Sequence, residues 1–271
     1  MNSARVALAA LALPVLAGIA WMAAAGAPAH YLGINAGALL VAALWIGFGW
    51  SARSLSQRRG LTLALLAILF LPLVLGPHVN GIARWIAIGP FALHTGMLVG
   101  PALAILASRD PDYAVPILLT GLFAALLQPD AATGFALTFA AIGAHDATKD
   151  WKIGLVGIVG FIASLRMFVI GELPATPFVE RVLIDALALS PWAALALFLS
   201  LAASFALILF AGPADKPQRL ALAGAFFGFS MAALMSHYPT ILIGYGAAPI
   251  LGLGFALALL HAESEAATSE Q

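Results

Sequence analysis

Long apolar runs separated by short polar breaks dominate this sequence, and no other feature restricts its fold as strongly. Ten runs approach the roughly 20 residues that a helix needs to cross the hydrocarbon core of a membrane. They lie near residues 5–25, 31–50, 60–76, 90–107, 112–127, 132–145, 152–170, 186–211, 218–236 and 242–260. Backbone groups in lipid must be satisfied within the segment, so such runs form helices. We therefore predict an all-α polytopic membrane protein with about ten transmembrane helices, in which residues 1–261 form one domain and 262–271 a short acidic tail.

The composition excludes several classes of function. Of the 271 residues, 63% are hydrophobic and 9% are charged, whereas a soluble domain carries about 25% charged residues. The 12 Lys and Arg residues balance the 12 Asp and Glu residues, so no net charge attracts the chain to nucleic acid. Cysteine is absent, the six histidines are scattered without an i, i+4 pair, and no phosphate- or dinucleotide-binding motif occurs. We therefore expect no disulfide, no metal and no cofactor.

The basic residues set the expected orientation. Arg84, Arg166 and Arg181 fall on one side of the ten-span arrangement. The other nine basic residues fall on the opposite side: Arg5, Arg53, Arg58, Arg59, Arg109, Lys149, Lys152, Lys216 and Arg219. Because Lys and Arg are enriched in cytoplasmic loops, both termini are predicted to be cytoplasmic. Two questions about this topology stay open. Residues 112–145 either cross the membrane fully or form a re-entrant hairpin. The first run is either a retained helix, which its length favours, or a cleaved signal peptide.

Polar residues on the predicted outer side are the candidate substrate-binding groups. Asn80 and Arg84 lie between the third and fourth spans, in a stretch that also reads as an ordinary turn with an aromatic anchor. Gln128 and Asp130 lie between two short apolar helices, where an acid is costly unless it is hydrated or paired, here with Arg84 or Arg166. Arg166 lies within an apolar span, so it either marks a functional site or reaches toward the nearby interface.

The outer loop from Gly171 to Asp185 is the longest polar stretch on that side and contains Glu180 and Arg181. Arg181 and Asp185 are four residues apart and would pair across one helical turn. The loop reads equally as an amphipathic interfacial helix with a solvated face and as a segment that faces a substrate. Its carboxylates are therefore candidates for chemistry rather than assigned groups.

Four short motifs at these positions occur in a familiar order. Residues 80–86 read Asn-Gly-Ile-Ala-Arg-Trp-Ile and residues 89–94 read Gly-Pro-Phe-Ala-Leu-His. Residues 128–133 read Gln-Pro-Asp-Ala-Ala-Thr, and residues 239–247 read Pro-Thr-Ile-Leu-Ile-Gly-Tyr-Gly-Ala. Together they resemble Asn-Gly-Ala-Arg-Arg-Trp-Ile, Gly-x-Phe-x-x-Gln, Gln-Pro-Asp-x-Gly-Thr and Pro-x-x-x-x-Ser-Tyr-Gly-Gly of the SEDS family (shape, elongation, division and sporulation), the FtsW- and RodA-like lipid II polymerases. The resemblance covers the chain from about residue 60 onward.

The resemblance is incomplete in the loop that supplies the family's catalytic Asp. The family reads Leu-Pro-x-x-His-Thr-Asp-Phe there, whereas residues 173–178 read Leu-Pro-Ala-Thr-Pro-Phe. Alternative alignments place that Asp at Val179 or at Pro177, and neither side chain accepts a proton. The resemblance implies a base that takes a proton from a sugar hydroxyl and cations that stabilise the departing lipid pyrophosphate. Arg84 remains for the second role, and Glu180 or Asp185 are the candidates for the first.

Three functions remain open at this point. The chain is a divergent cell-wall glycosyltransferase with Glu180 or Asp185 as base, or a non-catalytic scaffold or regulator of the division or elongation machinery that keeps a site for a lipid-linked sugar precursor. A transporter of that precursor, with Arg166 and Asp130 along the path, is the third. The resemblance implies peptidoglycan assembly, cell shape or cell division in the bacterial inner membrane, and a single-span transpeptidase as partner.

Overall fold

A computed structural model describes residues 3–49, 52, 54–89, 91–212 and 214–269, with the side chains of 261–269 left out. The described chain is almost entirely helical, with one small hairpin. In chain order the elements are α1 (Ser3–Ala24), α2 (Ala29–Phe48), α3 (Leu55–Phe70), α4 (Pro72–Leu75), β1 (Trp85–Ile88), β2 (Phe91–His94), α5 (Thr95–Arg109), α6 (Ala114–Leu127), α7 (Ala131–Thr148), α8 (Trp151–Ile170), α9 (Val182–Leu189), α10 (Pro191–Ala206), the π-helical turn η1 (Leu207–Ala211), α11 (Lys216–Met235) and α12 (Ala247–Ser269).

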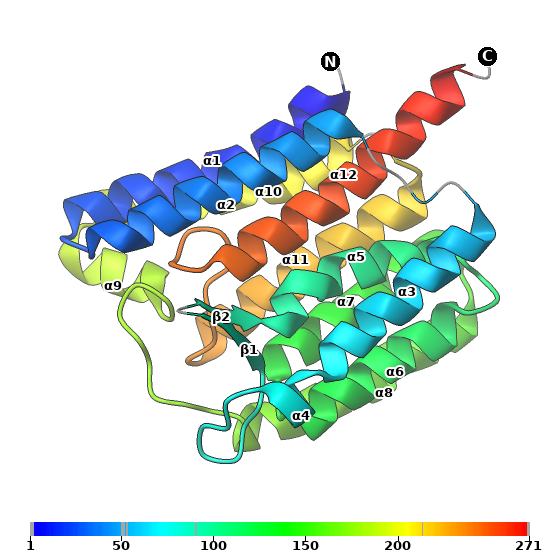
Figure 1. Ribbon diagram of the computed structural model, residues 1–271, viewed down its shortest axis with the longest axis horizontal. Helices are drawn as coiled ribbons and strands as arrows, with labels where there is room; N and C mark the ends of the chain where they lie inside the picture. Colours follow the sequence, from blue (N-terminus) through cyan, green and yellow to red (C-terminus); the bar gives the residue numbers. More distant parts are fainter. Residues whose placement is uncertain (1–2, 50–51, 53, 90, 213, 270–271) are drawn as a thin grey trace.

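The long helices run alongside one another as a bundle, and the first turns of α1 and the last turns of α12 lie at the same end (Figure 1). Helices α7 and α11 form the most extensive helix pair. A Cβ atom added at Gly143, Gly224 or Gly228 would meet backbone atoms of the facing helix. Small residues let helix backbones approach closely in lipid. The glycines on the facing sides of these two helices therefore allow their close packing.

The structure bears out the helical membrane fold, though not every predicted crossing. Among the described residues, six helical stretches are long and apolar enough to span a membrane: α1, α2, α3 with α4, α8, α10 with η1, and α11. Helices α5, α6 and the first part of α12 are apolar but shorter. At 1.5 Å per residue the 14 residues of α6 measure about 21 Å, less than the ~30 Å hydrocarbon core. The protein is a multi-pass membrane protein.

Three boundaries differ from the sequence-based prediction. The expected fourth span from residue 90 begins only at Thr95, because Trp85 to His94 form an antiparallel hairpin. Its turn includes Gly89, whose φ of +57° is readily adopted only without a side chain. The expected eighth span is broken at Ser190, which ends α9 and caps α10 by accepting a hydrogen bond from the Ala193 amide. The expected tenth span begins at residue 247, because residues 242–246 form turns.

The end of the bundle that carries the hairpin also gathers two loops, and we call it the hairpin end. The loop at residues 171–181 pairs with the 236–246 segment through an isolated bridge between Glu180 and Pro239. The Thr240 amide donates to the Val179 carbonyl (2.9 Å), and the Tyr245 amide donates to the Phe178 carbonyl (2.7 Å). Segments more than 50 residues apart in sequence are thus held together where the candidate polar groups lie.

Candidate functional site

Arg84 is buried at the hairpin end, with 1% of its surface exposed. It precedes β1, and its carbonyl accepts hydrogen bonds from the Thr95 amide (3.0 Å) and the Thr95 hydroxyl (3.3 Å), which ties the hairpin to the start of α5. Its Cζ lies 4.8 Å from the centroid of the Tyr238 ring and 5.7 Å from that of Trp85. These are cation–π distances. The aromatic rings therefore hold the guanidinium without using its hydrogen-bond donors.

Two of those donors have no partner. Nε and Nη2 of Arg84 are buried and make no hydrogen bond within the described part of the chain. Nη2 also lies close to the backbone at Gly171, where an added Cβ would come within 2.9 Å of it and still closer to the Pro129 carbonyl. A buried donor left unpaired costs roughly 1–3 kcal/mol. Such a pattern is typical of a site that receives a polar ligand or ordered water.

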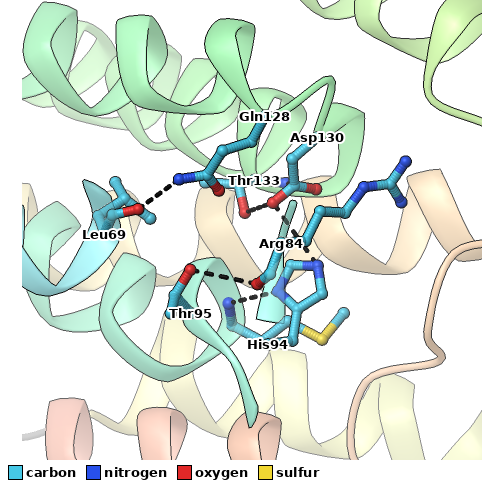
Figure 2. Close-up of polar contacts among 8 residues, drawn as sticks. Leu69, Arg84, His94, Thr95, Gln128, Asp130 and Thr133 are labelled. Atoms are coloured by element: carbon cyan, nitrogen blue, oxygen red, sulfur yellow. Dashed lines mark hydrogen bonds and ion pairs between the residues drawn. The ribbon is translucent and has the colours of Figure 1, made fainter. Parts of the chain in front are cut away.

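Asp130 and Gln128 occupy the turn between α6 and α7, and both are fully buried. Asp130 caps α7 by accepting hydrogen bonds from the Thr133 amide (3.2 Å) and the Thr133 hydroxyl. Gln128 donates through Nε2 to the Leu69 carbonyl, while its Oε1 has no hydrogen-bond partner in the described structure. Figure 2 shows these side chains next to Arg84. The structure therefore joins two of the separate stretches singled out from the sequence.

The basic side chain that lies nearest to the Asp130 carboxylate is His94, not an arginine. The Nδ1 atom of His94 accepts a hydrogen bond from the Met97 amide (3.2 Å) and so carries no hydrogen. Its Nε2 then carries the hydrogen and points toward Asp130 Oδ2 at 3.5 Å (Figure 2). The sequence left Arg84 and Arg166 as alternative partners for this acid. Arg84 acts on it only as a nearby charge, and no described ion pair includes Arg166.

The acidic groups at the hairpin end are tuned in opposite directions. Burial alone would raise the pKa of Asp130, but the neighbouring His94, the charge of Arg84 and the Thr133 hydrogen bond outweigh it, so the pKa lies well below its ordinary value. Burial raises the pKa of Glu180, although the Thr176 amide donates to its Oε2 at 2.6 Å. Burial also raises the pKa of Tyr238 to about 12. Asp130 is therefore a weak base, and Tyr238 keeps its proton at neutral pH.

Three of the candidate residues lie outside this cluster. Asn80 is exposed with φ of +52° and, with Gly81 at +78°, forms the turn between Val79 and Ile82. Positive φ at both central residues is typical of an Asn-Gly hairpin turn. Arg166 is exposed on α8, and Asp185 lies half-buried in the first turn of α9. The expected pair between Arg181 and Asp185 does not occur among the described ion pairs.

Sequence reasoning missed His94, Thr133 and Tyr238. Scattered histidines gave no metal pattern, and no three His, Asp or Glu side chains of the described residues could hold a metal ion together. A signal was nevertheless present, because His94 and Asp130 each directly precede an apolar helix, where a side chain that accepts a hydrogen bond caps the first turn. Tyr238 gave no comparable signal. Its Oη lies near the Ala131 backbone without reaching hydrogen-bond geometry.

Comparison with known proteins addresses the fold. No family model matches the sequence, and no curated protein matches it either. The chain is similar to a solved structure of the rod shape determining protein RodA of Thermus thermophilus, with a TM-score of 0.68, 17% identity, and 94% of each chain covered. The chain has the RodA fold. It is also similar to a chain of a peptidoglycan synthase complex described as coordinating polymerization and crosslinking, with a TM-score of 0.63, 21% identity, and 96% of this chain and 97% of that chain covered.

The RodA-like fold bears out the family resemblance at the level of architecture. At this identity the likeness gives the fold alone, so the chemistry must be read from the site itself. Within the described residues the site offers two guanidinium nitrogens of Arg84 without a hydrogen-bond partner, a neutral phenol at Tyr238 and an unpaired amide oxygen at Gln128. Its acid, Asp130, has both oxygens engaged. The arrangement suits recognition of an anionic group better than removal of a proton.

Proposed function

We propose that this chain is a SEDS-like protein of cell-wall assembly in the bacterial inner membrane that binds a lipid-linked pyrophosphate saccharide, such as lipid II, around Arg84. One observation carries the proposal: the guanidinium is buried, yet Nε and Nη2 have no hydrogen-bond partner among the residues that the structure describes. Guanidinium groups bind phosphate oxygens through paired, charge-assisted hydrogen bonds. The RodA-like fold and the likeness to a chain of a peptidoglycan synthase complex support this biological setting. On the proposed topology the hairpin end faces the periplasm.

Binding without polymerisation is the form of the proposal that the residues favour. A general base needs a free lone pair within reach of the sugar hydroxyl and a pKa near the working pH. The pKa of Asp130 is lowered and both of its oxygens accept hydrogen bonds. The positions that align with the family's catalytic Asp hold Pro177 or Val179. The chain would then act as a scaffold for the division or elongation machinery, beside a transpeptidase with a single membrane anchor.

Glu180 supports a second candidate function, a polymerase with a displaced base. It lies one residue beyond Val179, its pKa is raised by burial, and its backbone pairs with Pro239, next to the Tyr238 that contacts Arg84. A raised carboxyl pKa is what a general base at neutral pH requires. This function needs the Glu180 side chain to release the Thr176 amide and turn toward a bound sugar.

Binding and polymerisation are tested separately. Purified protein in nanodiscs is titrated with labelled lipid II, and Arg84→Gln should weaken binding by about tenfold, the loss of one charge-assisted pair. Arg166→Gln is the matched control, because it removes an exposed arginine near the same end of the bundle. Equal affinity in Arg84→Gln and the wild type would refute the proposed site. Equal loss in Arg166→Gln would favour a path along α8 instead.

The polymerisation assay uses the same protein with lipid II and separates products by length. We expect no glycan polymer from the wild type at any pH between 5 and 9. Polymer that disappears in Glu180→Gln, but persists in Asp185→Asn, would establish the displaced base. The same result would refute the proposal that the chain is a non-catalytic scaffold.

A further inference from the structure

A pocket of about 390 Å³ opens on the side of the bundle, away from the Arg84 cluster. It lies between α9, α10 and α11, where α10 packs mainly on α1 and α9 and touches α11 little. Figure 1 shows α9 at the hairpin end of this region. The pocket is lined by Arg181, Phe198, Phe205, Phe226, Met231 and Thr240, among others. Its volume lies within the range of about 300–1,000 Å³ that is typical of small-molecule sites.

The pocket is apolar along its length and polar at one end. Phe198 and Leu234 are 53% and 52% exposed at its rim, so it opens where the surrounding helices face lipid. Arg181 and Thr240 both line the pocket and mark its polar end, because each directly follows one of the two bridged residues, Glu180 and Pro239. Contact between a hydrocarbon chain and this apolar wall removes apolar surface from water, which is favourable. The shape is that of a site for a molecule with one charged end and one hydrocarbon end.

Two polar side chains at this end have hydrogen-bonding atoms without a partner in the described part of the chain. Thr240 is 6% exposed, and its hydroxyl makes no hydrogen bond in the described part of the chain. The buried Nε of Arg181 has no hydrogen-bond partner either, and no described ion pair includes its guanidinium. A guanidinium and a hydroxyl that line the same pocket can both donate hydrogen bonds to the oxygens of a phosphate ester. Because Arg181 is positively charged, an anionic head group would be the complementary ligand at this end.

We infer that this lateral pocket binds one anionic phospholipid of the surrounding leaflet. Its phosphate would accept hydrogen bonds from Arg181 and Thr240, and one acyl chain would lie between Phe198 and Phe226. The inference is independent of the proposed function at Arg84, because the two sites share no side chain. A bound lipid would fill the space between α10 and α11 and so fix α9 and the loop that carries Glu180.

Native mass spectrometry of the full chain, released from nanodiscs of phosphatidylglycerol and phosphatidylcholine in equal amounts, measures the retained lipid. We expect one phosphatidylglycerol to stay bound to the wild type. Ala202→Trp fills the pocket from an exposed position on α10 and should abolish retention, whereas Ala196→Trp adds the same side chain elsewhere on that helix and should not. Arg181→Gln adds no volume and should lower retention by about tenfold.

Each result decides the inference. Retention that is equal in Ala202→Trp and Ala196→Trp would overturn it, as would retention that does not distinguish phosphatidylglycerol from phosphatidylcholine. If Ala202→Trp released a bound membrane protein and left lipid retention unchanged, a protein helix would be the occupant and the inference would fail. Arg84→Gln should leave lipid retention unchanged, so failure of this site and failure of the proposed lipid II site are distinguishable.

Discussion

Gly96 provides a direct test of the site's construction, because its missing side chain makes room for the contact between Thr133 and Asp130. A Cβ atom added at Gly96 would overlap the Thr133 hydroxyl and lie 2.8 Å from Thr133 Cβ and 3.0 Å from Asp130 Oδ2. The substitution Gly96→Ala therefore forces Thr133 away from Asp130. All of these atoms are buried, so no flexible surface side chain can move aside to absorb the change.

The magnitude follows from three contributions. Loss of a hydrogen bond to a charged group costs about 1.5–3 kcal/mol, and forcing extra volume into a filled site costs about 1–3 kcal/mol. The better helix propensity of alanine returns at most about 1 kcal/mol. We therefore expect Gly96→Ala to lower the free energy of unfolding by about 2–5 kcal/mol. The matched control is Gly100→Ala on the same helix, where the added Cβ would lie at an ordinary 3.4 Å from Phe229 Cζ and stability should stay within about 1 kcal/mol of the wild type.

Unfolding by SDS in dodecylmaltoside micelles, followed by tryptophan fluorescence, measures both variants. The double variant Gly96→Ala with Thr133→Ala relieves the overlap, so its loss should be smaller than the sum of the two single losses by about 1–2 kcal/mol. If Gly96→Ala were as stable as Gly100→Ala, or if the two substitutions were additive, the packing of Gly96 against the Asp130 cap would be wrong.

Three further predictions concern the loops around the site and the opposite end of the bundle. Asn35 donates to the Gly244 carbonyl (2.9 Å) and accepts from the Gly246 amide (3.1 Å), so Asn35→Ala should cost about 2–4 kcal/mol in the free energy of unfolding and speed hydrogen exchange in residues 244–246. Because burial raises the pKa of Glu180 above its ordinary 4.5, its ionisation opposes folding as the pH rises. Glu180→Gln should therefore raise the melting temperature at pH 8 but not at pH 4. The hydrogen bond from Arg59 lowers the pKa of Asp110 below 3.8, so the stability it contributes is present at neutral pH and is lost on further acidification; thermal melts of Asp110→Asn should converge with the wild type only in strong acid.

The sequence predicts the helices well because the apolar runs leave the backbone no other way to satisfy its hydrogen bonds in lipid. It predicts the hairpin poorly for the same reason. Residues 90–94 are mostly apolar and adjoin an apolar helix, so the sequence predicts them as the start of a span. The reversal at Gly89 depends on the pairing of Trp85 with His94, a contact that hydropathy does not record.

The sequence predicts which segments contribute to the candidate site, but not which side chains contact one another there. Arg84, Gln128 and Asp130 follow from the cost of placing polar groups beside apolar helices, and the structure brings them together. Asn80 lies apart from them, in the turn between Val79 and Ile82, where an Asn-Gly pair supplies two residues of positive φ. The predicted partner of Asp130 was wrong. The sequence points to two arginines, whereas the packing of β2 against the α6–α7 turn brings His94 next to Asp130.

The contrast between the two buried acids at the hairpin end, Asp130 and Glu180, bears most directly on function. His94, Arg84 and Thr133 stabilise the ionised form of Asp130 and so lower its pKa. An acid with a lowered pKa is a weak base, but its carboxylate can still orient the side chains around it. Glu180 is the opposite case, because burial raises its pKa even though the Thr176 amide donates a hydrogen bond to its side chain. Of these two acids, only Glu180 therefore has the raised pKa that a general base at neutral pH requires. The rings of Trp85 and Tyr238 hold the Arg84 guanidinium, and Thr95 bonds its backbone carbonyl. No described hydrogen bond or ion pair joins Arg84 to a carboxylate of the 171–181 loop, so a change at Glu180 leaves these contacts of Arg84 intact.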